Sequence, residues 1–418
     1  MPRLLLLLPR TTYRAEDFLE AAERLKLKVT IGVEDQDQQG SFDDRLTLNF
    51  RDAKGCVKTA VQYATEHPLQ TVLGVDDRTA VLAALIASAL GLAHNSVDSV
   101  TAARNKHHMR QRLRDHGVPV PSFTVFSVHA DPATTAKTLR YPCVVKPLSL
   151  SASCGVIRAN GPAEYIAAFY RVSALLGKLG HAVSADTSGH LLLVEDFVPG
   201  VEVALEGLLT EGRLRVLALF DKPDPLNGPF FEETIYITPS RLPESTQARI
   251  AQCAARAAEA LGLREGPIHG ELRVNDSGVW VIELAARSIG GRCSRSLRFA
   301  AGLSREEVIL RHALRLTLPE FEGMQKPAGV MMIPIPKSGL LQEVRGQIEA
   351  LAVPGVEELM ITAQPGEDLV QLPEGTRYLG FIVARGDCPE EVEATLREAH
   401  RRLHVVIGRT PAAGAMTF

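Results

Sequence analysis

The first 100 residues alternate between short apolar runs and longer segments in which apolar residues recur every three or four positions. The apolar runs span 4–8, 28–33 and 71–75, and the segments with helical periodicity span 14–25, 52–66 and 79–90. Strands that alternate with helices predict a mainly parallel, doubly wound α/β sheet. No G-x-G-x-x-G motif follows the run at 4–8, which disfavours an ordinary NAD enzyme.

Two acids, Asp76 and Asp77, stand at the end of the run 71–75. Ligands of open α/β sheets bind at this end of the strands, but an aspartate before a helix is also a common N-cap. Both interpretations stay open. Residues 96–116 are predicted to form one capped helix with basic side chains, which the glycine and prolines of 117–121 end.

The next 80 residues are rich in predicted strands. Lys146 lies in the β-branched strand 141–148, where a lysine is rarely buried without a partner, so we expect it to face a cleft. The small, hydroxyl-rich turn at 149–155 can wrap backbone N–H groups around a phosphate, although serine-rich hairpin loops without a ligand are common. Further along, the segment 228–240 contains two adjacent acids, Glu232 and Glu233.

Two alternating runs flank Asp276-Ser277-Gly278 and predict a hairpin with a three-residue loop. This loop pairs Val274 with Trp280 and Glu271 with Glu283. The predicted core face of the hairpin consists of Leu272, Val274, Trp280 and Ile282.

The opposite face of this hairpin places Glu271 directly across from Glu283. At a distance of roughly 5 Å and an effective dielectric constant of about 20, the two charges repel by about 3 kcal/mol. A shared proton, a nearby cation or a bound metal has to offset this repulsion. Two carboxylates on rigid strands suit Mg²⁺, while a solvent-facing acidic pair or a slipped register is the simpler alternative.

Composition narrows the class of protein further. A 45% apolar and 23% charged chain is ordinary for a globular protein, and a net charge of −3 offers no general attraction to nucleic acid or to an anionic membrane. The six cysteines contain no C-x-x-C pair, so neither a zinc site nor a disulfide framework is indicated, and we expect a cytoplasmic protein. The apolar run 4–8 is too short for a signal peptide, and no run approaches the ~20 residues of a membrane helix.

Four segments, in this order, resemble the ATP-grasp ligases. They are RNKHHMRQRLRDHGVPVP at 104–121, YPCVVKPLSLSASCGV at 141–156, LLVEDFVPGVEVALEGLL at 192–209, and HGELRV with VWVIELAARSIGG within 269–291. Within that superfamily, the ELAARSIGG ending and the segment 228–240 are most similar to the L-amino-acid ligases, which join two amino acids.

The resemblance implies binding roles for single positions. Lys106 and Lys146 match the lysines that contact the ATP phosphates. The other nucleotide-binding positions are Ser151, Ser153 and Gly155 in the phosphate-covering loop, Glu195, Asp196, Phe197 and Val198 in the hinge that receives the adenine, and Glu202, which holds the ribose hydroxyls.

The same resemblance implies a catalytic centre. Glu271 and Glu283 match the metal ligands, and Arg287 matches the arginine beside the acyl-phosphate, so Arg287, Lys146 and Glu283 are the expected catalytic residues. The expected substrate pocket consists of Glu233, His269, Arg287, Gly290 and Gly291. Ala285 stands where many ATP-grasp enzymes have asparagine, but the L-amino-acid ligases resemble this chain there, so we interpret it as a mark of the subfamily.

The implied reaction is the ATP-dependent ligation of a carboxylate and an amine, with L-amino acids as substrates, ATP and Mg²⁺ (or Mn²⁺) as cofactors, an acyl-phosphate intermediate, and ADP and phosphate as products. Two alternatives stay open: an ATP-grasp ligase for bicarbonate, formate or a biosynthetic intermediate, and a non-catalytic ATP-binding protein.

The implied domains are an α/β domain at 1–100, an ATP-grasp domain at 101–320 with a small lobe at 121–194 and a large lobe at 195–320, and an α+β domain at 321–418. Residues 325–418 either complete the substrate pocket or form a homodimer contact.

Overall fold

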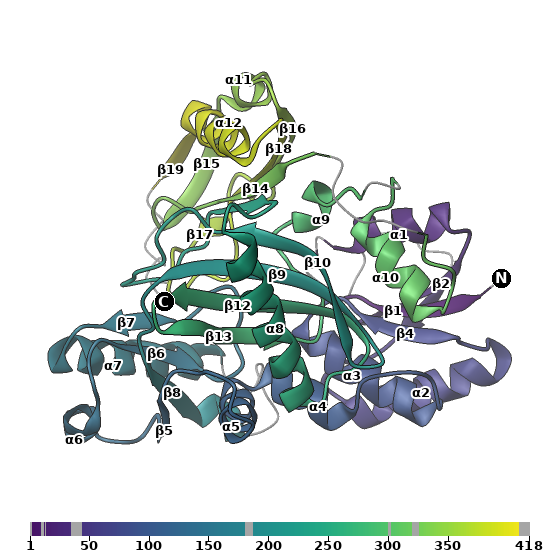
Figure 1. The fold of residues 1–418 in the computed structure, drawn as a ribbon, viewed down its shortest axis with the longest axis horizontal. Coiled ribbons are helices and arrows are strands. Elements are labelled where there is room, and N and C mark those ends of the chain that lie inside the picture. Colours follow the sequence, from purple (N-terminus) through teal and green to yellow (C-terminus); the bar gives the residue numbers. More distant parts are fainter. Residues whose placement is uncertain are drawn as a thin grey trace, which may run out of the picture. The chain divides into compact units, whose positions relative to one another are not determined.

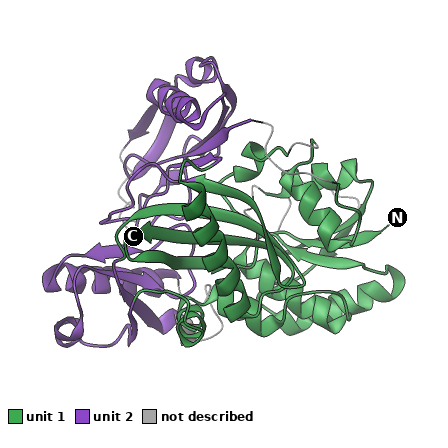
Figure 2. Cartoon of the chain, in the orientation of Figure 1, with its two compact units in different colours: residues 1–121, 198–220, 240–325 green, residues 122–197, 221–239, 326–418 purple. Residues whose placement is uncertain are grey.

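The computed structural model describes residues 2–9, 12, 14–34, 44–179, 187–299, 302–319 and 326–408. The chain forms two compact units, each assembled from separate segments (Figure 2). Unit 1 consists of 1–121, 198–220 and 240–325, and unit 2 consists of 122–197, 221–239 and 326–418. The elements are labelled in Figure 1.

Unit 1 begins with a four-stranded parallel sheet in the order β3-β2-β1-β4. Its elements are β1 Arg3–Leu7, α1 Ala15–Arg24, β2 Lys28–Val33, β3 Arg45–Thr47, α2 Ala53–Glu66, β4 Thr71–Gly74 and α3 Asp77–Ala89. The leucines of β1 are almost completely buried, as expected for a strand with helices on both faces. The predicted strand–helix alternation is confirmed.

Two helices replace the single helix predicted over 96–116. They are α4 (Val97–Arg104) and α5 (Lys106–Asp115). The break falls at Asn105, whose side-chain oxygen accepts hydrogen bonds from the backbone N–H groups of His107 and His108 at 3.0 and 3.2 Å. An asparagine inside a helical pattern can cap a new helix instead of continuing the old one, and here it does so. Lys106 therefore lies at the first position of α5.

The second sheet of unit 1 has the strand order β13-β12-β9-β10, and α8 lies against it. The bounds are β9 Val201–Thr210, β10 Arg213–Asp221, α8 Glu244–Leu261, β12 Gly266–Asn275, β13 Gly278–Ala285, α9 Cys293–Ser296 and α10 Arg305–Ala313. The buried face of α8 is rich in alanine, which lets the helix approach the sheet closely; it packs with apolar residues of β9, β12 and β13 in one core.

The first segment of unit 2 is a four-stranded sheet in the order β5-β8-β6-β7, covered by α7. Its elements are β5 Phe123–Ser127, α6 Pro132–Thr135, η1 Ala136–Thr138, β6 Cys143–Pro147, β7 Ile157–Ala159, α7 Pro162–Leu179, η3 Thr187–His190 and β8 Leu191–Asp196. The aromatic residues Tyr165 and Phe169 of α7 are fully buried against the strands.

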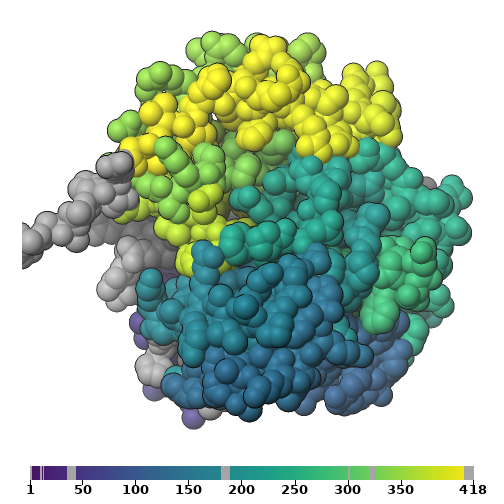
Figure 3. Space-filling view, turned by 90° about the vertical axis from the view of Figure 1, so that its left-hand side faces the viewer, coloured from purple at the N-terminus to yellow at the C-terminus, as the bar shows by residue number. Residues whose placement is uncertain are grey.

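The remainder of unit 2 contains two further groups of strands. One has the order β11-β14-β18-β16, the other β17-β15-β19, and a shared core beneath α12 includes side chains from both. The bounds are β11 Ile235–Thr238, β14 Ala328–Ile333, β15 Gly339–Arg345, α11 Gln347–Leu351, β16 Val356–Ile361, β17 Asp368–Leu369, β18 Gly380–Arg385, α12 Pro389–Arg402 and β19 His404–Gly408. In the space-filling view, this C-terminal part is coloured green to yellow and the first segment of unit 2 is largely blue (Figure 3).

Among the helices that the structure describes, none combines the length and the apolar character needed to span a bilayer.

We expect Asn105→Ala to lower the free energy of unfolding by about 1 kcal/mol, because two N–H groups at the start of α5 lose their acceptor. Asn105→Asp retains an acceptor at the same place and should remain close to the wild type. Denaturant titration followed by circular dichroism measures both variants. If both variants lose the same free energy of unfolding, the loss does not come from the missing hydrogen-bond acceptor.

Candidate active site

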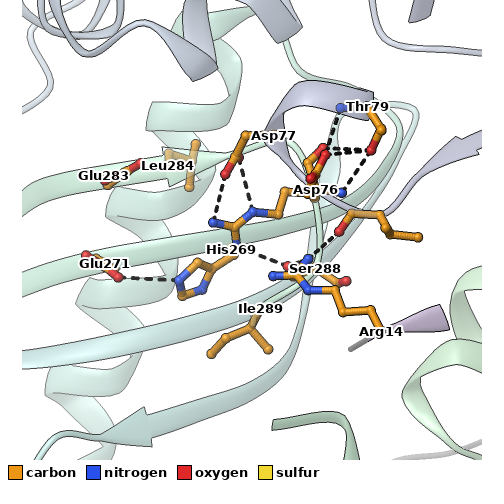
Figure 4. Close-up of polar contacts among 12 residues, drawn as sticks. Arg14, Asp76, Asp77, Thr79, His269, Glu271, Glu283, Leu284, Ser288 and Ile289 are labelled. Atoms are coloured by element: carbon orange, nitrogen blue, oxygen red, sulfur yellow. Dashed lines mark hydrogen bonds and ion pairs between the residues drawn. The ribbon is translucent and has the colours of Figure 1, made fainter. Parts of the chain in front are cut away.

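Two glutamates face each other across the hairpin of β12 and β13. Glu271 pairs with Glu283, as predicted, and the two side chains lie on neighbouring strands in Figure 4. The folded chain therefore does place the two negative charges opposite each other, and the alternative of a slipped register at this pair is excluded.

Nearer the turn, the predicted register is wrong by one residue. Val274 pairs with Val279 and not with Trp280, and Asn275 pairs with Gly278, so the loop has two residues instead of three. The shift exchanges the faces of β13: Val279 is buried, whereas Trp280 is only partly buried. A two-residue turn competes with the three-residue turn in this sequence, and the burial of the valines selects it.

A β-bulge restores the predicted pairing at the acidic residues. Val281 and Glu283 both have partners on β12, and Ile282 between them is the extra residue. Without the bulge, strict alternation would point Glu283 toward the same face as the buried Val281; the extra residue turns it to the opposite face. The fully buried Arg110 donates a hydrogen bond of 2.7 Å to the Ile282 carbonyl and stabilises the bulge.

Lys106 supplies the cation that the acidic pair requires. Its Nζ atom lies 3.1 Å from each carboxylate oxygen of Glu283, and its side chain is almost fully buried. A charge-assisted contact of this kind offsets the repulsion by Glu271. The contact of Lys106 with ATP phosphates stays a prediction, because in the structure its ammonium group binds a carboxylate.

The donor atoms around this pair suit a hard divalent cation. Carboxylate oxygens of Glu202 and Glu271, on the paired strands β9 and β12, lie within 4.8 Å of each other. With Glu283 opposite Glu271, the donors are all carboxylate oxygens on rigid strands, which is the chemistry that Mg²⁺ prefers and zinc does not. These residues therefore fit the predicted metal site.

Arg273, two residues after Glu271, is buried and organises the site. Its Nε donates to Glu202 at 2.7 Å, and its Nη1 donates to the Val198 carbonyl at 2.7 Å. One guanidinium thus fixes both the acid predicted to hold the ribose and the end of the predicted hinge. A long-range partner of this kind has no local signal in the sequence.

Arg287 is held in one plane by Asp77. Its Nε and Nη2 atoms donate to the two carboxylate oxygens of Asp77 at 3.1 and 3.2 Å. Burial raises the pKa of Asp77, but the positive charges of Arg287, Arg14 and Lys106 outweigh burial and hold this pKa below its ordinary value of 3.8. Asp77 is therefore ionised at neutral pH.

The two acids at the end of β4 have different tasks. Asp76 is the N-cap of α3, with a hydrogen bond of 2.8 Å from the Thr79 N–H and a reciprocal bond from the Asp76 N–H to Thr79 (Figure 4). The capping interpretation is correct for Asp76, whereas Asp77 is the first residue of α3 and binds Arg287, so a ligand role at this strand end stays a prediction.

The loop that follows Arg287 is clamped through the backbone of Ile289. Its N–H donates to Glu206 at 2.7 Å, and its carbonyl accepts from Arg305 at 2.8 Å. Arg305 in turn binds Glu306 and lies 3.8 Å from Glu206. All three charged side chains are buried, so the loop is fixed by a network that the sequence analysis missed entirely.

Two acids compete for the single guanidinium of Arg305. Burial raises the pKa of Glu206 to about 7, because the nearby positive charge of Arg305 does not fully offset the loss of water. Glu206 therefore takes up its proton near neutral pH, and Glu306 remains the close partner of Arg305.

The other predicted substrate residues of unit 1 are His269 on β12 and the glycines that follow Ile289. His269 is buried, with Nε2 3.5 Å from Glu271 and Nδ1 3.3 Å from the Leu205 carbonyl. Gly291 adopts a left-handed conformation, φ 64°, and the Gly290 carbonyl accepts a hydrogen bond from the Cys293 N–H at 3.2 Å. Their contacts with a substrate stay predictions.

In unit 2, Lys146 has a carboxylate partner as well. It lies on β6, and its ammonium group binds Glu195 on the neighbouring strand β8, with both side chains about 5% exposed. Lys146 was expected to face a cleft, but it is buried, and its charge is paired with Glu195, a residue predicted only as part of the hinge. The phosphate role of Lys146 is untested.

The turn after β6 has an unusual backbone. Ala152 and Ser153, which are not glycine, have φ angles of 54° and 55°, a conformation that costs of order 1 kcal/mol per residue. The N–H of Gly155 donates to the Pro373 carbonyl at 2.7 Å, so this group is engaged by the chain itself. Ser151 and Ser153 each accept a backbone hydrogen bond, from Cys154 and Val156.

The hinge segment is tied down inside unit 2. The N–H groups of Asp196 and Phe197 donate to the carbonyls of Ser122 and Pro142 at 2.9 and 3.0 Å. The Phe197 ring lies beneath the Arg158 guanidinium, 4.1 Å from its centroid, and offers a cation–π contact. Adenine binding at this segment stays a prediction.

Glu233, the predicted substrate acid, has two internal partners. The ammonium group of Lys222 binds its carboxylate, and the Tyr236 hydroxyl donates to the same oxygen at 2.7 Å. The charge of Glu233 is therefore already balanced by a buried lysine.

We expect the Glu206 carboxyl to make the folding of unit 1 pH-dependent. Its pKa is about 7 in the folded chain and near its ordinary value of 4.5 in the unfolded chain, so between these pH values the folded state holds the extra proton. The free energy of unfolding then falls as the pH rises from about 4.5 to 7, by at most about 3 kcal/mol.

Glu206→Gln keeps an acceptor for the Ile289 N–H and removes this ionisation. Chemical denaturation at pH 5 and pH 8 should show a smaller stability loss for the variant than for the wild type. If the two lose the same free energy between pH 5 and 8, Glu206 does not titrate in that range.

Comparison with known families agrees with this geometry. The ATP-grasp domain model matches residues 139–296, and the model of the L-amino acid ligase C-terminal domain 2 matches residues 331–408. The second match covers most of the C-terminal residues 325–418, for which the sequence alone left two roles open.

Individual relatives were found in sequence and in structure. The crystal structure of an L-amino acid ligase from Bacillus licheniformis is 30% identical, covers 98% of this chain and 99% of that chain, and superimposes with a TM-score of 0.84. Alanine–anticapsin ligase from Bacillus subtilis (strain 168) is 26% identical over 53% of this chain and 49% of that enzyme, and dapdiamide A synthase from Enterobacter agglomerans is 24% identical over 82% of this chain and 81% of that enzyme.

The chain thus spans about half the length of the first curated relatives it matches, but nearly the whole of the similar solved structure. The predicted ATP-grasp fold is confirmed by the domain match and the structural superposition. The protein belongs to the L-amino acid ligase family of ATP-grasp proteins.

Proposed function

We propose that this protein joins the carboxyl group of one L-amino acid to the amino group of another in an ATP-dependent reaction. The observation that carries the proposal is the pair Glu271 and Glu283, which a bulge turns face to face beside Lys106. A like-charged pair held on rigid strands has no structural benefit of its own and is suited to a cation.

The reaction has two steps that balance as follows. A carboxylate oxygen of the donor attacks the γ-phosphorus of ATP, the bond to the β–γ bridging oxygen breaks, and ADP leaves. The acceptor amine then attacks the carbonyl carbon of the acyl-phosphate, inorganic phosphate leaves, and the nitrogen loses a proton. Little covalent work falls to the protein, whose task is positioning and charge stabilisation.

Glu271 and Glu283 would hold Mg²⁺, with the Glu202 carboxylate near by. Bound Mg²⁺ supplies positive charge that neutralises phosphate oxygens. Lys106 and Lys146 would contact these oxygens after exchanging their carboxylate partners for phosphate. Since each lysine already lies beside a carboxylate, the exchange is between anions and leaves no buried lysine unpaired.

Arg287 would bind the oxygens of the acyl-phosphate. Asp77 fixes the plane of its guanidinium through two hydrogen bonds, and Arg305 with Glu206 fixes the backbone two residues later. A donor with so little freedom costs little entropy to align in the transition state.

The direct test is phosphate release from ATP–Mg²⁺ with the twenty L-amino acids, singly and in pairs, followed by mass spectrometry of the positive reactions. We expect phosphate and a dipeptide from at least one pair. Phosphate without dipeptide would retain carboxylate activation and reject an amino acid as the acceptor. No phosphate release with any amino acid would reject the proposed function.

We expect Glu283→Gln to lower kcat by on the order of 100-fold or more, because the loss of a metal ligand removes several kcal/mol of charge stabilisation. The KM for Mg²⁺ should rise as well, which a purely structural role would not cause. Glu66→Gln, an exposed acid at the end of α2, serves as a control with wild-type kinetics. Wild-type turnover by the Glu283 variant would exclude the metal site.

A further inference from the structure

Glu232 is an acid with no use in the proposed mechanism. It lies next to Glu233 but differs from it in its surroundings. Among the residues that the structure describes, none forms a hydrogen bond or ion pair with the Glu232 carboxylate, whereas Glu233 has Lys222 and Tyr236. Glu232 is about half buried, and burial raises its pKa.

Glu232 lines a cavity of about 10 Å³ inside unit 2. Such a volume holds about one water-sized group. An ammonium group is of that size and donates up to three hydrogen bonds, whereas a planar guanidinium is too large. A half-buried carboxylate without a partner gains most from a cation, since the charge pair offsets its desolvation.

The walls of the cavity strengthen this attraction. Ile335, Val370 and Leu372 are apolar and lower the local dielectric constant around Glu232. Arg377 also lines the cavity, but it forms an ion pair with Glu367 at 2.7 Å. The positive charge of Arg377 is therefore paired with Glu367 and does not neutralise Glu232.

The cavity adjoins the turn that is expected to cover the phosphates. Ala152, one of the two left-handed residues of that turn, forms part of its lining. In an α-amino acid, one carbon atom separates the ammonium group from the carboxyl carbon. A donor whose carboxylate accepts a phosphoryl group beneath this turn would carry its ammonium group close to Ala152.

The donor and the acceptor differ in the charge that the reaction requires of their amino groups. The acceptor amine has to lose its proton before or during attack, and an unpaired carboxylate beside it would favour the charged, non-nucleophilic form. The donor amine does not react and remains charged in the product. A carboxylate in this place suits the donor.

We propose that Glu232 binds the α-ammonium group of the amino acid whose carboxyl group is activated, in a subsite that the C-terminal residues 370–378 complete. The proposal rests on the proposed function and deepens it. Hydrogen bonds hold this C-terminal segment against the first segment of unit 2: the Gly155 N–H binds the Pro373 carbonyl, and Arg171 binds Glu374 through two nitrogens at 2.5 and 2.8 Å.

The test compares each of the twenty L-amino acids with its des-amino carboxylic acid, for example L-leucine with 4-methylpentanoate. Isothermal titration in the presence of Mg²⁺ and a non-hydrolysable ATP analogue measures binding to the wild type, to Glu232→Gln and to the control variant Glu349→Gln. We expect the wild type to bind at least one amino acid about 10- to 100-fold more tightly than its des-amino analogue, as for a charged hydrogen bond.

Glu232→Gln should lose this preference while its affinity for the ATP analogue and for the des-amino acid remains unchanged. Glu349→Gln, at an exposed acid on α11, should keep the preference. The proposal is overturned if the preference survives in Glu232→Gln, if Glu349→Gln loses it to the same extent, or if the wild type has none. Since binding is measured without turnover, a preference that depends on Glu232 would stand even if phosphate release failed with every amino acid.

Discussion

Glu271 and Glu283 repel each other across a strand pair, and the centre of unit 1 is arranged around that repulsion. The bulge at Ile282 turns Glu283 away from the core, Arg110 binds the carbonyl that the bulge exposes, and Asn105 caps the helix whose first residue is Lys106. A helix break, a bulge and a buried arginine therefore serve one result, the contact of Lys106 with Glu283. A hairpin whose only role was to pack in the core would not require the helix break, the bulge or the buried arginine.

The predicted phosphate and substrate cations all have carboxylate partners in the structure. Lys106 binds Glu283, Lys146 binds Glu195, and Arg287 binds Asp77. Removing a buried cation from its partner is costly unless another anion takes its place. Carboxylates of the chain therefore balance these charges, and an anionic ligand has to exchange with a carboxylate instead of entering a field of free positive charge.

Local patterns in the sequence predicted what depends on local forces. The alternation of apolar residues located β12 and β13 and the pairing of Glu271 with Glu283. The same alternation misplaced the turn by one residue, because a two-residue and a three-residue loop both fit this sequence. Only the burial of Val279 selects between them. The partners of Glu202, Glu195 and Arg287 lie far away in sequence, so no spacing rule could identify them. The resemblance to a family supplied positions, but it did not supply these ion pairs.

Glu232 and Glu233 show most clearly that the sequence does not reveal the environment of a side chain. The two residues are adjacent and chemically identical, and the sequence favoured Glu233 as the substrate acid through a resemblance alone. The structure distinguishes them by environment: a buried lysine and a tyrosine bind Glu233, whereas Glu232 faces a small cavity with apolar walls. A buried lysine already offsets the charge of Glu233, whereas no residue that the structure describes forms an ion pair with Glu232, so a ligand cation would stabilise the Glu232 carboxylate. The difference lies in the side-chain environment: Lys222 and Tyr236 bind Glu233 from nearby in the sequence, whereas the cavity beside Glu232 is lined in part by residues more than 100 positions away, such as Ile335 and Val370.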